Sequence, residues 1–332
     1  MRKHIFFCSL LILICTLAQA QSYHFSQFFS TPLLTNPANT GMIDGSYRVA
    51  SNLRSQGKST PNTFFTGYVS GDVRFLETSL PSGHKAGAGV FVMTDRSLGG
   101  ASQTNSLGLS AAYHVGLDDY DGHSIGLGFQ GTYNQRRLDL NRLSFGNQFG
   151  NDGYDATLPT GENLNNVNRN YFDVNAGLIY KANLEDKSFF LGGSVYNILR
   201  QKNNIMTEDY KMPARYVVQA GGQIFVGEYG KIYFSLTNMG QAGVHETTAG
   251  GAYGLQLTDT DTNEISMGIW YRYKDAIIPY LGYYYQGFQL GLSYDYTVSS
   301  LKTATQVRNA YELTLIYSAS NKSKLRAAIP WY

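Results

Sequence analysis

The sequence predicts an all-β protein, a transmembrane antiparallel β-barrel of about 14 strands preceded by a leader that is not a strand. Three observations predict this fold. Residues 46–318 divide into short segments that alternate apolar and polar side chains, and turn residues separate most of them. A secretory signal precedes these segments. Beyond the N-terminal region, no apolar run reaches the ~20 residues that a membrane-spanning helix requires. An even number of such segments in an exported chain is typical of a spanning barrel.

The composition is compatible with one barrel that contacts lipid rather than nucleic acid. The 332 residues are enough for one closed unit, and only 15% of them are charged. The formal net charge is +2, so the chain offers no strongly basic surface to nucleic acid. We therefore expect the bilayer of the bacterial outer membrane, and no nucleic acid, as a partner.

Residues 1–20 have the parts of a secretory signal peptide. Arg2–His4 form a basic start, Ile5–Leu17 an apolar core, and Ala18–Ala20 supplies small residues where signal peptidase requires them. We predict cleavage after Ala20. The alternative, a membrane-spanning anchor, is weak because the apolar run is too short.

Residues 21–45 form a leader that a barrel wall does not explain. The leader is rich in Phe, Asn, Pro and Thr, and it has too many large apolar residues to be stable when exposed to water. Its large apolar residues are Phe25, Phe28, Phe29, Leu33 and Leu34. A barrel of about 14 strands leaves a lumen that such a peptide can fill. We therefore expect a plug in or across the lumen, with a disordered periplasmic leader as the alternative.

The barrel itself is expected to span residues 46–318. Its segments sort their side chains by face: Phe65 and Val69, for example, lie on one face of their segment and Asp72 on the other. An Arg or Lys that faces lipid at mid-bilayer costs ~2–4 kcal/mol, so a spanning barrel requires this sorting. The predicted strands are Ser46–Ser55, Phe64–Phe75, Lys85–Asp95, Gln103–Val115, Ser124–Asn134, Tyr171–Ala182, Ser188–Ile198, Arg215–Val226, Lys231–Met239, His245–Leu257, Glu264–Tyr273, Ala276–Tyr285, Phe288–Thr297 and Asn309–Ser318.

The lengths of the connections predict the topology. If the first strand rises from the periplasm, all periplasmic connections are short, and the longest connections fall outside the cell: Gln135–Asn170, Leu199–Ala214 and Val298–Arg308. This asymmetry is typical of outer-membrane barrels. Both ends of the mature chain, including a C-terminal tail at residues 319–332, are then expected in the periplasm.

Two further features of the predicted strands concern tyrosine and proline. Tyrosines gather near strand ends, as at Tyr271, Tyr273 and Tyr283–Tyr285. This favours an aromatic girdle at the level of the lipid headgroups, with general cross-strand packing as the alternative. Pro279 lies inside a predicted strand and removes one donor from the ladder, which marks either a bulge or a locally open seam.

The sequence offers no convincing catalytic or metal-binding constellation. Its six histidines show neither H-x-x-H nor H-E-x-x-H spacing, and the only cysteines, Cys8 and Cys15, lie in the signal. Asp118–Gly122 has acidic residues suited to calcium, but other spaced oxygen ligands are missing, which favours a solvated acidic turn. We therefore predict a protein without enzymatic activity, cofactor or metal.

Two stretches of the chain resemble a known family. Residues 25–41, FSQFFSTPLLTNPANTG, are similar to the start of the PorP/SprF family of Bacteroidetes outer-membrane proteins, which follows F-S-Q-Y-x-x-N-P-L-x-x-N-P-A-x-x-G. Gly291–Thr297 looks like the family's G-x-S-Y-D-Y-T strand, and Glu312 stands where the family's S-H-E has its glutamate. The chain departs from the pattern at Ser30-Thr31 and at Ala310-Tyr311. The motif residues of the leader are Phe25, Ser26, Gln27, Pro32, Asn36, Pro37 and Gly41.

The resemblance implies a function in protein export. It implies a barrel of the type IX secretion system that binds the C-terminal sorting domain of a secreted cargo protein or adhesin. Such a barrel supports the export or surface attachment of its cargo, works with other type IX components and, in many species, serves gliding motility.

The external connections are the expected place for cargo. Gln135–Asn170 and Leu199–Ala214 are the candidates, with Tyr154, Tyr171 and Tyr210 as aromatic anchors. The alternative is that these connections only shield the barrel mouth. Two other functions remain open, a diffusion channel or hydrophobic-solute transporter and, as the weakest, an outer-membrane enzyme.

Overall fold

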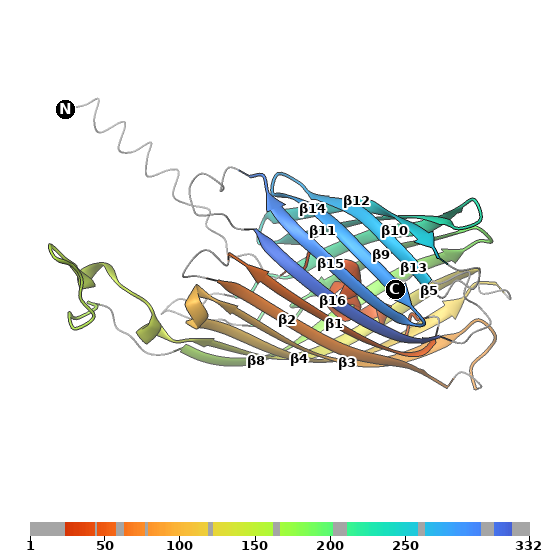
Figure 1. The fold of residues 1–332 in the computed structure, drawn as a ribbon. Coiled ribbons are helices and arrows are strands. Elements are labelled where there is room, and N and C mark those ends of the chain that lie inside the picture. The colour runs from red at the N-terminus through yellow and green to blue at the C-terminus, as the bar shows by residue number, and fades with distance from the viewer. Residues whose placement is uncertain are drawn as a thin grey trace, which may run out of the picture.

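The chain folds into a closed antiparallel β-barrel (Figure 1). The computed structural model describes residues 24–43, 45–57, 63–76, 79–118, 122–161, 167–201, 211–257, 263–299 and 309–320. The signal peptide, its cleavage site at Ala20 and the predicted C-terminal tail at 319–332 therefore lie outside the described residues, except for the last two residues of the final strand.

The described residues form sixteen strands, of which β6 and β7 make a separate two-stranded sheet and the other 14 close the barrel. The barrel strands are β1 (Gly45–Gln56), β2 (Phe64–Phe75), β3 (Lys85–Ser97), β4 (Ser102–Gly116), β5 (His123–Leu138), β8 (Val167–Asn183), β9 (Lys187–Tyr196), β10 (Arg215–Val226), β11 (Gly230–Gln241), β12 (Val244–Gln256), β13 (Asn263–Arg272), β14 (Ala276–Tyr285), β15 (Phe288–Thr297) and β16 (Ala310–Ser320). Every predicted strand is found, and the predicted fold class is confirmed.

The barrel closes because its first and last strands pair. β1 and β16 run antiparallel from Arg48 opposite Ser318 to Gln56 opposite Ala310. Every other barrel strand pairs with the strand before and after it in the chain, and β5 pairs with β8 across the longest connection. Each barrel strand pairs with a neighbour on both sides over at least part of its length. The backbone N–H and C=O groups can therefore be hydrogen-bonded where the strands cross a membrane.

The two faces of the wall differ as the alternation predicted. On β16, Tyr311, Leu313 and Leu315 are exposed on the outer face, whereas Glu312 and Thr314 are buried toward the lumen. The other strands repeat the apolar outer face, and their inner face is mostly polar, with apolar side chains such as Phe91, Trp270 and Ile278 where the leader packs. An apolar outer band around a polar lumen is the arrangement that a lipid bilayer requires.

Pro279 interrupts one ladder without shifting it. On β14 and β15, Ile277 pairs with Tyr296 and Tyr280 with Ser293, and no pair forms at the positions between them. The register is the same on both sides, so Pro279 does not mark a bulge. The missing proline N–H instead leaves a short gap in the pairing.

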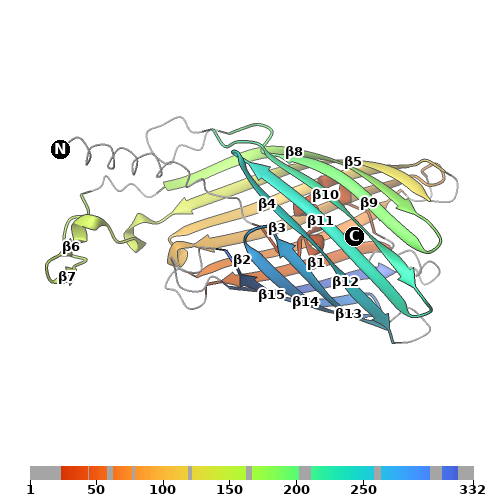
Figure 2. The same cartoon turned by 90° about the horizontal axis from the view of Figure 1, so that it is seen from above.

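The long and short connections lie at opposite ends of the barrel. We call the end where β5 stops and β8 starts the long-connection rim, and the other end the short-connection rim. At the long-connection rim a two-stranded hairpin, β6 (Phe149–Gly150) and β7 (Gly153–Tyr154), projects far beyond the wall (Figures 1 and 2). Two 3-10 helices precede it, η4 (Leu140–Arg142) and η5 (Gly146–Gln148), and a third, η3 (Leu98–Gly100), lies between β3 and β4.

The β5–β8 hairpin is taller than the sequence indicated. β5 was expected to end at Asn134 and β8 to begin at Tyr171, but their ladder continues to Leu138 opposite Val167. Gln135, Arg136 and the residues opposite them are polar on both faces of the sheet. Alternation disappears where neither face meets lipid, and for this reason the pattern missed this part of the strands.

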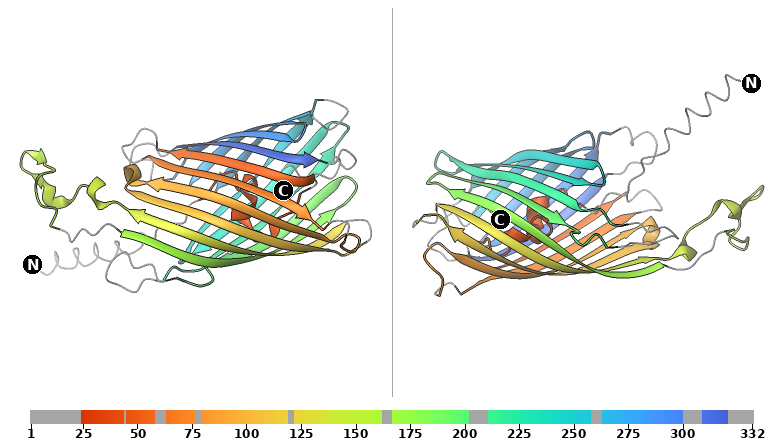
Figure 3. Two further views of the ribbon diagram at one scale, coloured as in Figure 1. Left: turned by 90° about the horizontal axis from the view of Figure 1, so that it is seen from below. Right: turned by 180° about the vertical axis from the view of Figure 1, so that it is seen from behind.

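The leader occupies the inside of the barrel as three short helical turns (Figure 3). These are η1 (Phe28–Ser30), α2 (Pro32–Thr35) and η2 (Pro37–Asn39). Prolines at the first position of α2 and η2 start these turns, since proline has the right φ and needs no donor there. Among the described helices, none has the length and apolar character to cross a membrane.

Candidate functional site

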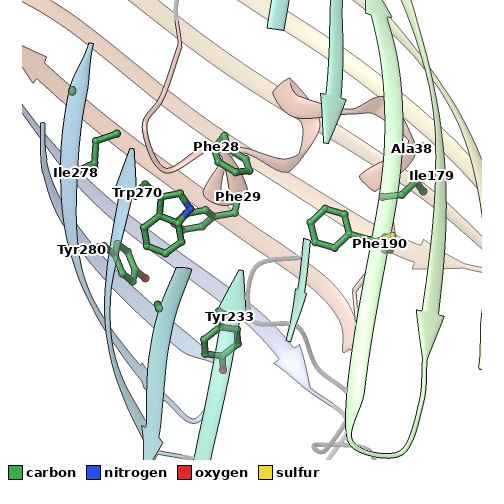
Figure 4. Packing of buried hydrophobic residues seen from close by; sticks show 12 residues of the cluster. Phe28, Phe29, Ala38, Ile179, Phe190, Tyr233, Trp270, Ile278 and Tyr280 are labelled. Carbon is green, nitrogen blue, oxygen red and sulfur yellow. The ribbon is translucent and has the colours of Figure 1, made fainter. Parts of the chain in front are cut away.

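The lumen of the barrel is filled by the leader. All residues from Phe25 to Ile43 are buried. Phe29 packs against Trp270 and Tyr280 on the wall, with ring centroids 5.4 and 5.7 Å apart. Figure 4 shows these rings on one side of the leader and Phe190 on the other. Burial of aromatic rings in contact with one another stabilises the leader inside the lumen.

A polar cluster holds the start of the leader at the long-connection rim. The backbone N–H groups of Ser26 and Gln27 donate to the two carboxylate oxygens of Glu312, at 2.6 and 2.9 Å. The Ser26 hydroxyl donates to Asp295 at 2.6 Å. One carboxylate therefore satisfies two backbone donors that would otherwise be buried without a partner.

Two arginines compensate the acids of this cluster. Arg54 Nη1 lies 3.0 Å from Asp295 Oδ2 and 3.1 Å from Glu312 Oε1, and Arg272 Nη2 lies 2.7 Å from the same Asp295 oxygen. All four charged side chains are buried. Because an isolated buried charge is costly, the removal of one member leaves the others poorly compensated. We call Ser26, Arg54, Arg272, Asp295 and Glu312 the rim cluster.

The two motifs that carry the family resemblance meet here. Gln27 Nε2 donates to Ser293 at 3.0 Å, and its Oε1 accepts from Thr314 at 2.9 Å. A Cβ on Gly291 would lie 2.7 Å from the same Oε1, so glycine leaves room for the amide. The F-S-Q motif of the leader is thus bound by the G-x-S-Y-D strand, although the bonded residues are 266 and 269 positions apart in the chain.

Glycines in the wall make room for the middle of the leader. Gly128 on β5 and Gly177 on β8 are cross-strand neighbours. A Cβ on Gly128 would stand 2.3 Å from Ala38 N, and one on Gly177 would stand 1.9 Å from Asn36 Oδ1. Asn36 also donates through Nδ2 to the carbonyl of Leu178 at 3.0 Å. Close backbone approach therefore fixes η2 against this part of the wall.

The end of the leader is bound near the short-connection rim. Gly41 N donates to Asp72 at 2.8 Å, and Asp72 forms a two-point ion pair with Arg48, at 3.0 and 2.9 Å. Gly41 has a φ of 69° and lies against Gly87, where a Cβ would come within 2.6 Å of the Gly41 Cα. Glycine is needed at both positions, because the conformation and the space exclude a side chain.

The direction of the leader bears on the expected topology. His24 lies 3.4 Å from Glu246 at the long-connection rim, whereas Ser320 pairs with Gly45 at the opposite rim. The sequence predicted both ends of the mature chain on one side, but the described residues nearest to them, His24 and Ser320, lie at opposite rims; the ends themselves lie outside the described residues. The leader crosses the lumen before it turns into β1, so its start and the end of β16 lie at opposite ends.

His24 is held in its neutral form. Burial lowers the pKa of His24 well below its usual value, and the positive charges of Arg272 and Arg54 lower it further. The Glu246 carboxylate nearby favours the protonated form, but burial and the two arginines outweigh it.

The three tyrosines expected to bind a partner are not brought together. Tyr154 lies on β7 with 52% of its surface exposed and contacts Phe149, at 5.3 Å between ring centroids. Tyr171 is half-buried in the wall, where its hydroxyl lies 3.8 Å from Met212 Sδ. Tyr210 lies outside the described residues. Of the two that the structure describes, Tyr154 is on the projecting hairpin and Tyr171 is not.

Sequence reasoning missed the basic half of the rim cluster. Arg54 and Arg272 were not singled out, although both occupy lumen-facing positions near strand ends. The signal available was their match to Asp295 and Glu312, which occupy lumen-facing positions at the same rim. Trp270 and Tyr280 were likewise missed as contacts of the leader.

The described residues hold no group of three or more His, Cys, Asp or Glu side chains that could bind a metal. In the acidic turn, Asp118 Oδ1 accepts from Gly122 N at 2.8 Å. This is a hydrogen bond within a turn. Asp119 to Asp121 lie outside the described residues.

Comparison with known proteins gave a family and a fold. Residues 17–317 match the family described as type IX secretion system membrane protein PorP/SprF. The Ralstonia pickettii toluene transporter TbuX is 11% identical, with a TM-score of 0.51 over 87% of this chain and 92% of TbuX. A Pseudomonas aeruginosa FadL homologue is 12% identical, with a TM-score of 0.48 over 87% of this chain and 94% of the homologue. At 11% identity the likeness to TbuX shows the fold alone. No curated protein gave a match.

Proposed function

Because this chain belongs to the PorP/SprF family of type IX secretion system membrane proteins, we propose that it binds a secreted or surface-displayed protein and performs no chemistry. The partner region is the C-terminal sorting domain of the cargo, and binding supports export or attachment, with gliding motility as one use. Its place is the outer membrane after cleavage at Ala20. Other type IX components are further partners.

The observation that carries this proposal is the projecting β6–β7 hairpin. Phe149 and Tyr154 are 57% and 52% exposed there, and their rings contact each other. Exposed aromatic pairs are typical anchors of protein interfaces. The hairpin stands clear of the barrel wall (Figure 2), which favours a binding surface over a shield for the mouth. The leader already fills the lumen beneath it, which favours a binding surface over an open pore.

The experiment replaces both aromatic residues, Phe149→Ser with Tyr154→Ser, in the organism that produces the protein. We expect the amount of one secreted protein that co-isolates with the barrel to fall about tenfold or more, since anchor residues contribute over 1 kcal/mol each. Leu184→Ser, at an apolar residue of the short-connection rim that is 44% exposed, is the control. Equal recovery of secreted proteins from both variants would contradict the proposal.

One observation favours a second function, passage of a hydrophobic solute. The gap in the β14–β15 ladder at Pro279 lies beside the apolar cluster of Phe29, Trp270 and Tyr280. A solute could bind such a cluster and leave through a weakened wall. Restoring the ladder donor with Pro279→Val separates the two functions: it would reduce solute uptake but leave recovery of the secreted protein unchanged.

A further inference from the structure

Among the described residues, the upper half of β8 pairs with a strand on one side only. β8 pairs with β5 over its whole length, from Val167 to Ala182. With β9 it pairs only from Ala176 to Asn183. Within the described part of the chain, no strand pairs with the other edge of residues 167–173. Strand edges with unused backbone groups are places where another strand can add.

One hydrogen bond fixes which residues face the open edge. The N–H of Ile198 donates to the carbonyl of Val174 at 3.2 Å, so the backbone groups of Val174 point away from β5. The backbone direction alternates along a strand. The N–H and C=O groups of Phe172, Asn170 and Asn168 therefore point the same way, to the open edge.

The open edge of β8 exists because hydrogen bonds turn β9 away from it, and not because the end of β9 is frayed. β9 turns away after Tyr196 at Asn197, which has a φ of 57°. Two lumen-facing side chains of β8 accept the backbone donors of this turn. Asn175 Oδ1 accepts from Asn197 N, and Asp173 Oδ1 accepts from Leu199 N, both at 3.1 Å. These two acceptors hold the turn in place and keep β9 from pairing higher up.

The edge lies beyond the lipid-facing band. Tyr133 and Phe172 are cross-strand neighbours on the outer face, and above them Arg137 lies opposite Asn168. Arg137 points outward and is exposed. Because an arginine facing hydrocarbon is costly, Arg137 and the edge beside it must stand above the hydrocarbon, with the aromatic pair at the headgroup level.

We infer that this edge binds an extended strand of the secreted partner by adding it to the barrel sheet next to β8. The inference rests on the proposed function and names the mode of binding. Backbone hydrogen bonds would give affinity, and alternate side chains would give specificity. Arg136 and Arg137 lie on β5, one strand away from the edge, where Arg136 faces the lumen side and Arg137 the outer side. The added strand is therefore acidic where it passes these arginines, and apolar next to Phe172.

The first test removes one edge donor. Asn170→Pro deletes an N–H that points away from β5, so the β5–β8 ladder keeps its hydrogen bonds, and proline is tolerated at such an edge. Asn170→Ala removes the same amide side chain but keeps the backbone N–H. We expect the proline variant to recover the secreted partner about five- to tenfold less well than the alanine variant, the effect of one lost hydrogen bond. Glu185→Pro, in a turn at the opposite rim, controls for proline itself, and heat-modifiable migration on gels shows that each barrel is folded.

The second test locates the partner directly. A cysteine at Phe172→Cys, labelled with a benzophenone maleimide on intact cells, should cross-link to an extended segment of a secreted protein. Cross-links to this chain's own residues or to a second copy would overturn the inference. If secreted protein is recovered equally from all variants and carries no cross-link, the edge is not its site, but the proposed function stands. If the wild type recovers no secreted protein, the proposed function itself fails.

Discussion

The Glu312 carboxylate is predicted to control whether the leader stays in the barrel. Glu312→Gln keeps the size of the side chain but removes its charge. The carboxylate accepts from Ser26 N and Gln27 N at 2.6 and 2.9 Å and lies 3.1 Å from Arg54. The amide of glutamine can replace only one of these acceptors, and its NH₂ group would face a backbone donor.

The size of the effect follows from these contacts. Breaking a buried ion pair costs about 3–5 kcal/mol, and the lower figure applies because Arg54 keeps Asp295 as a partner. About 3 kcal/mol corresponds to a factor of about 150 in the opening equilibrium. Amide hydrogen exchange measures this equilibrium for each segment. We expect residues 25–30 to exchange about 150-fold faster, while the barrel ladders keep their protection.

A matched variant separates leader release from general damage. Glu264→Gln makes the same change in another lumen-facing carboxylate, which contacts Lys231 at 3.1 Å and Tyr233 at 2.8 Å on the wall. It should leave exchange of residues 25–30 unchanged. If Glu312→Gln does the same, the carboxylate does not hold the leader, and the account of the rim cluster is refuted.

Three further predictions concern the same segment. Gly128→Leu should displace η2, because even a Cβ would lie 2.3 Å from Ala38 N, and exchange at residues 36–40 should rise while η1 stays protected; unchanged exchange would refute the contact. Deletion of residues 21–40 should raise ion conductance of the purified barrel in planar bilayers, and equal conductance of both forms would argue against a plug. The lowered pKa of His24 means that the unfolded state binds more protons at low pH, so the stability from neutral His24 is complete above its usual pKa of about 6.5 and is lost as the pH falls below it. Protection of residues 24–27, measured relative to the intrinsic exchange rate at each pH, should therefore fall between about pH 7 and 5, and His24→Gln should abolish this dependence; persistence in the variant would assign the effect to another group.

The sequence predicted the barrel because each strand shows the alternation of apolar and polar residues by itself. The outer face meets lipid and the inner face a polar lumen, so alternation alone locates strands such as β16. The same rule failed above the membrane, where Gln135 and Arg136 extend β5 without any change of environment between the faces. Alternation of apolar and polar residues locates a strand only where its two faces meet different environments. Where both faces meet water, the alternation disappears and the strand end cannot be located from it.

The contacts of the rim cluster were missed for a different reason. Arg54 and Arg272 bind Asp295 from β1 and β13, and the contact depends on the closure of the barrel and on the register of several ladders. Periodicity says that each of these side chains points inward, but it does not give their heights relative to one another. The path of the leader, from the long-connection rim to the other, depends on the same contacts.

The most direct test of the central claim, that this barrel binds a secreted protein, compares cells with and without it. The surface and secreted proteins of both strains are quantified, together with uptake of a small hydrophobic solute. The account predicts that one secreted or surface-displayed protein is lost or mislocated without the barrel, and that solute uptake is unchanged. Unchanged surface and secreted proteins with impaired uptake would contradict the claim and establish a transporter.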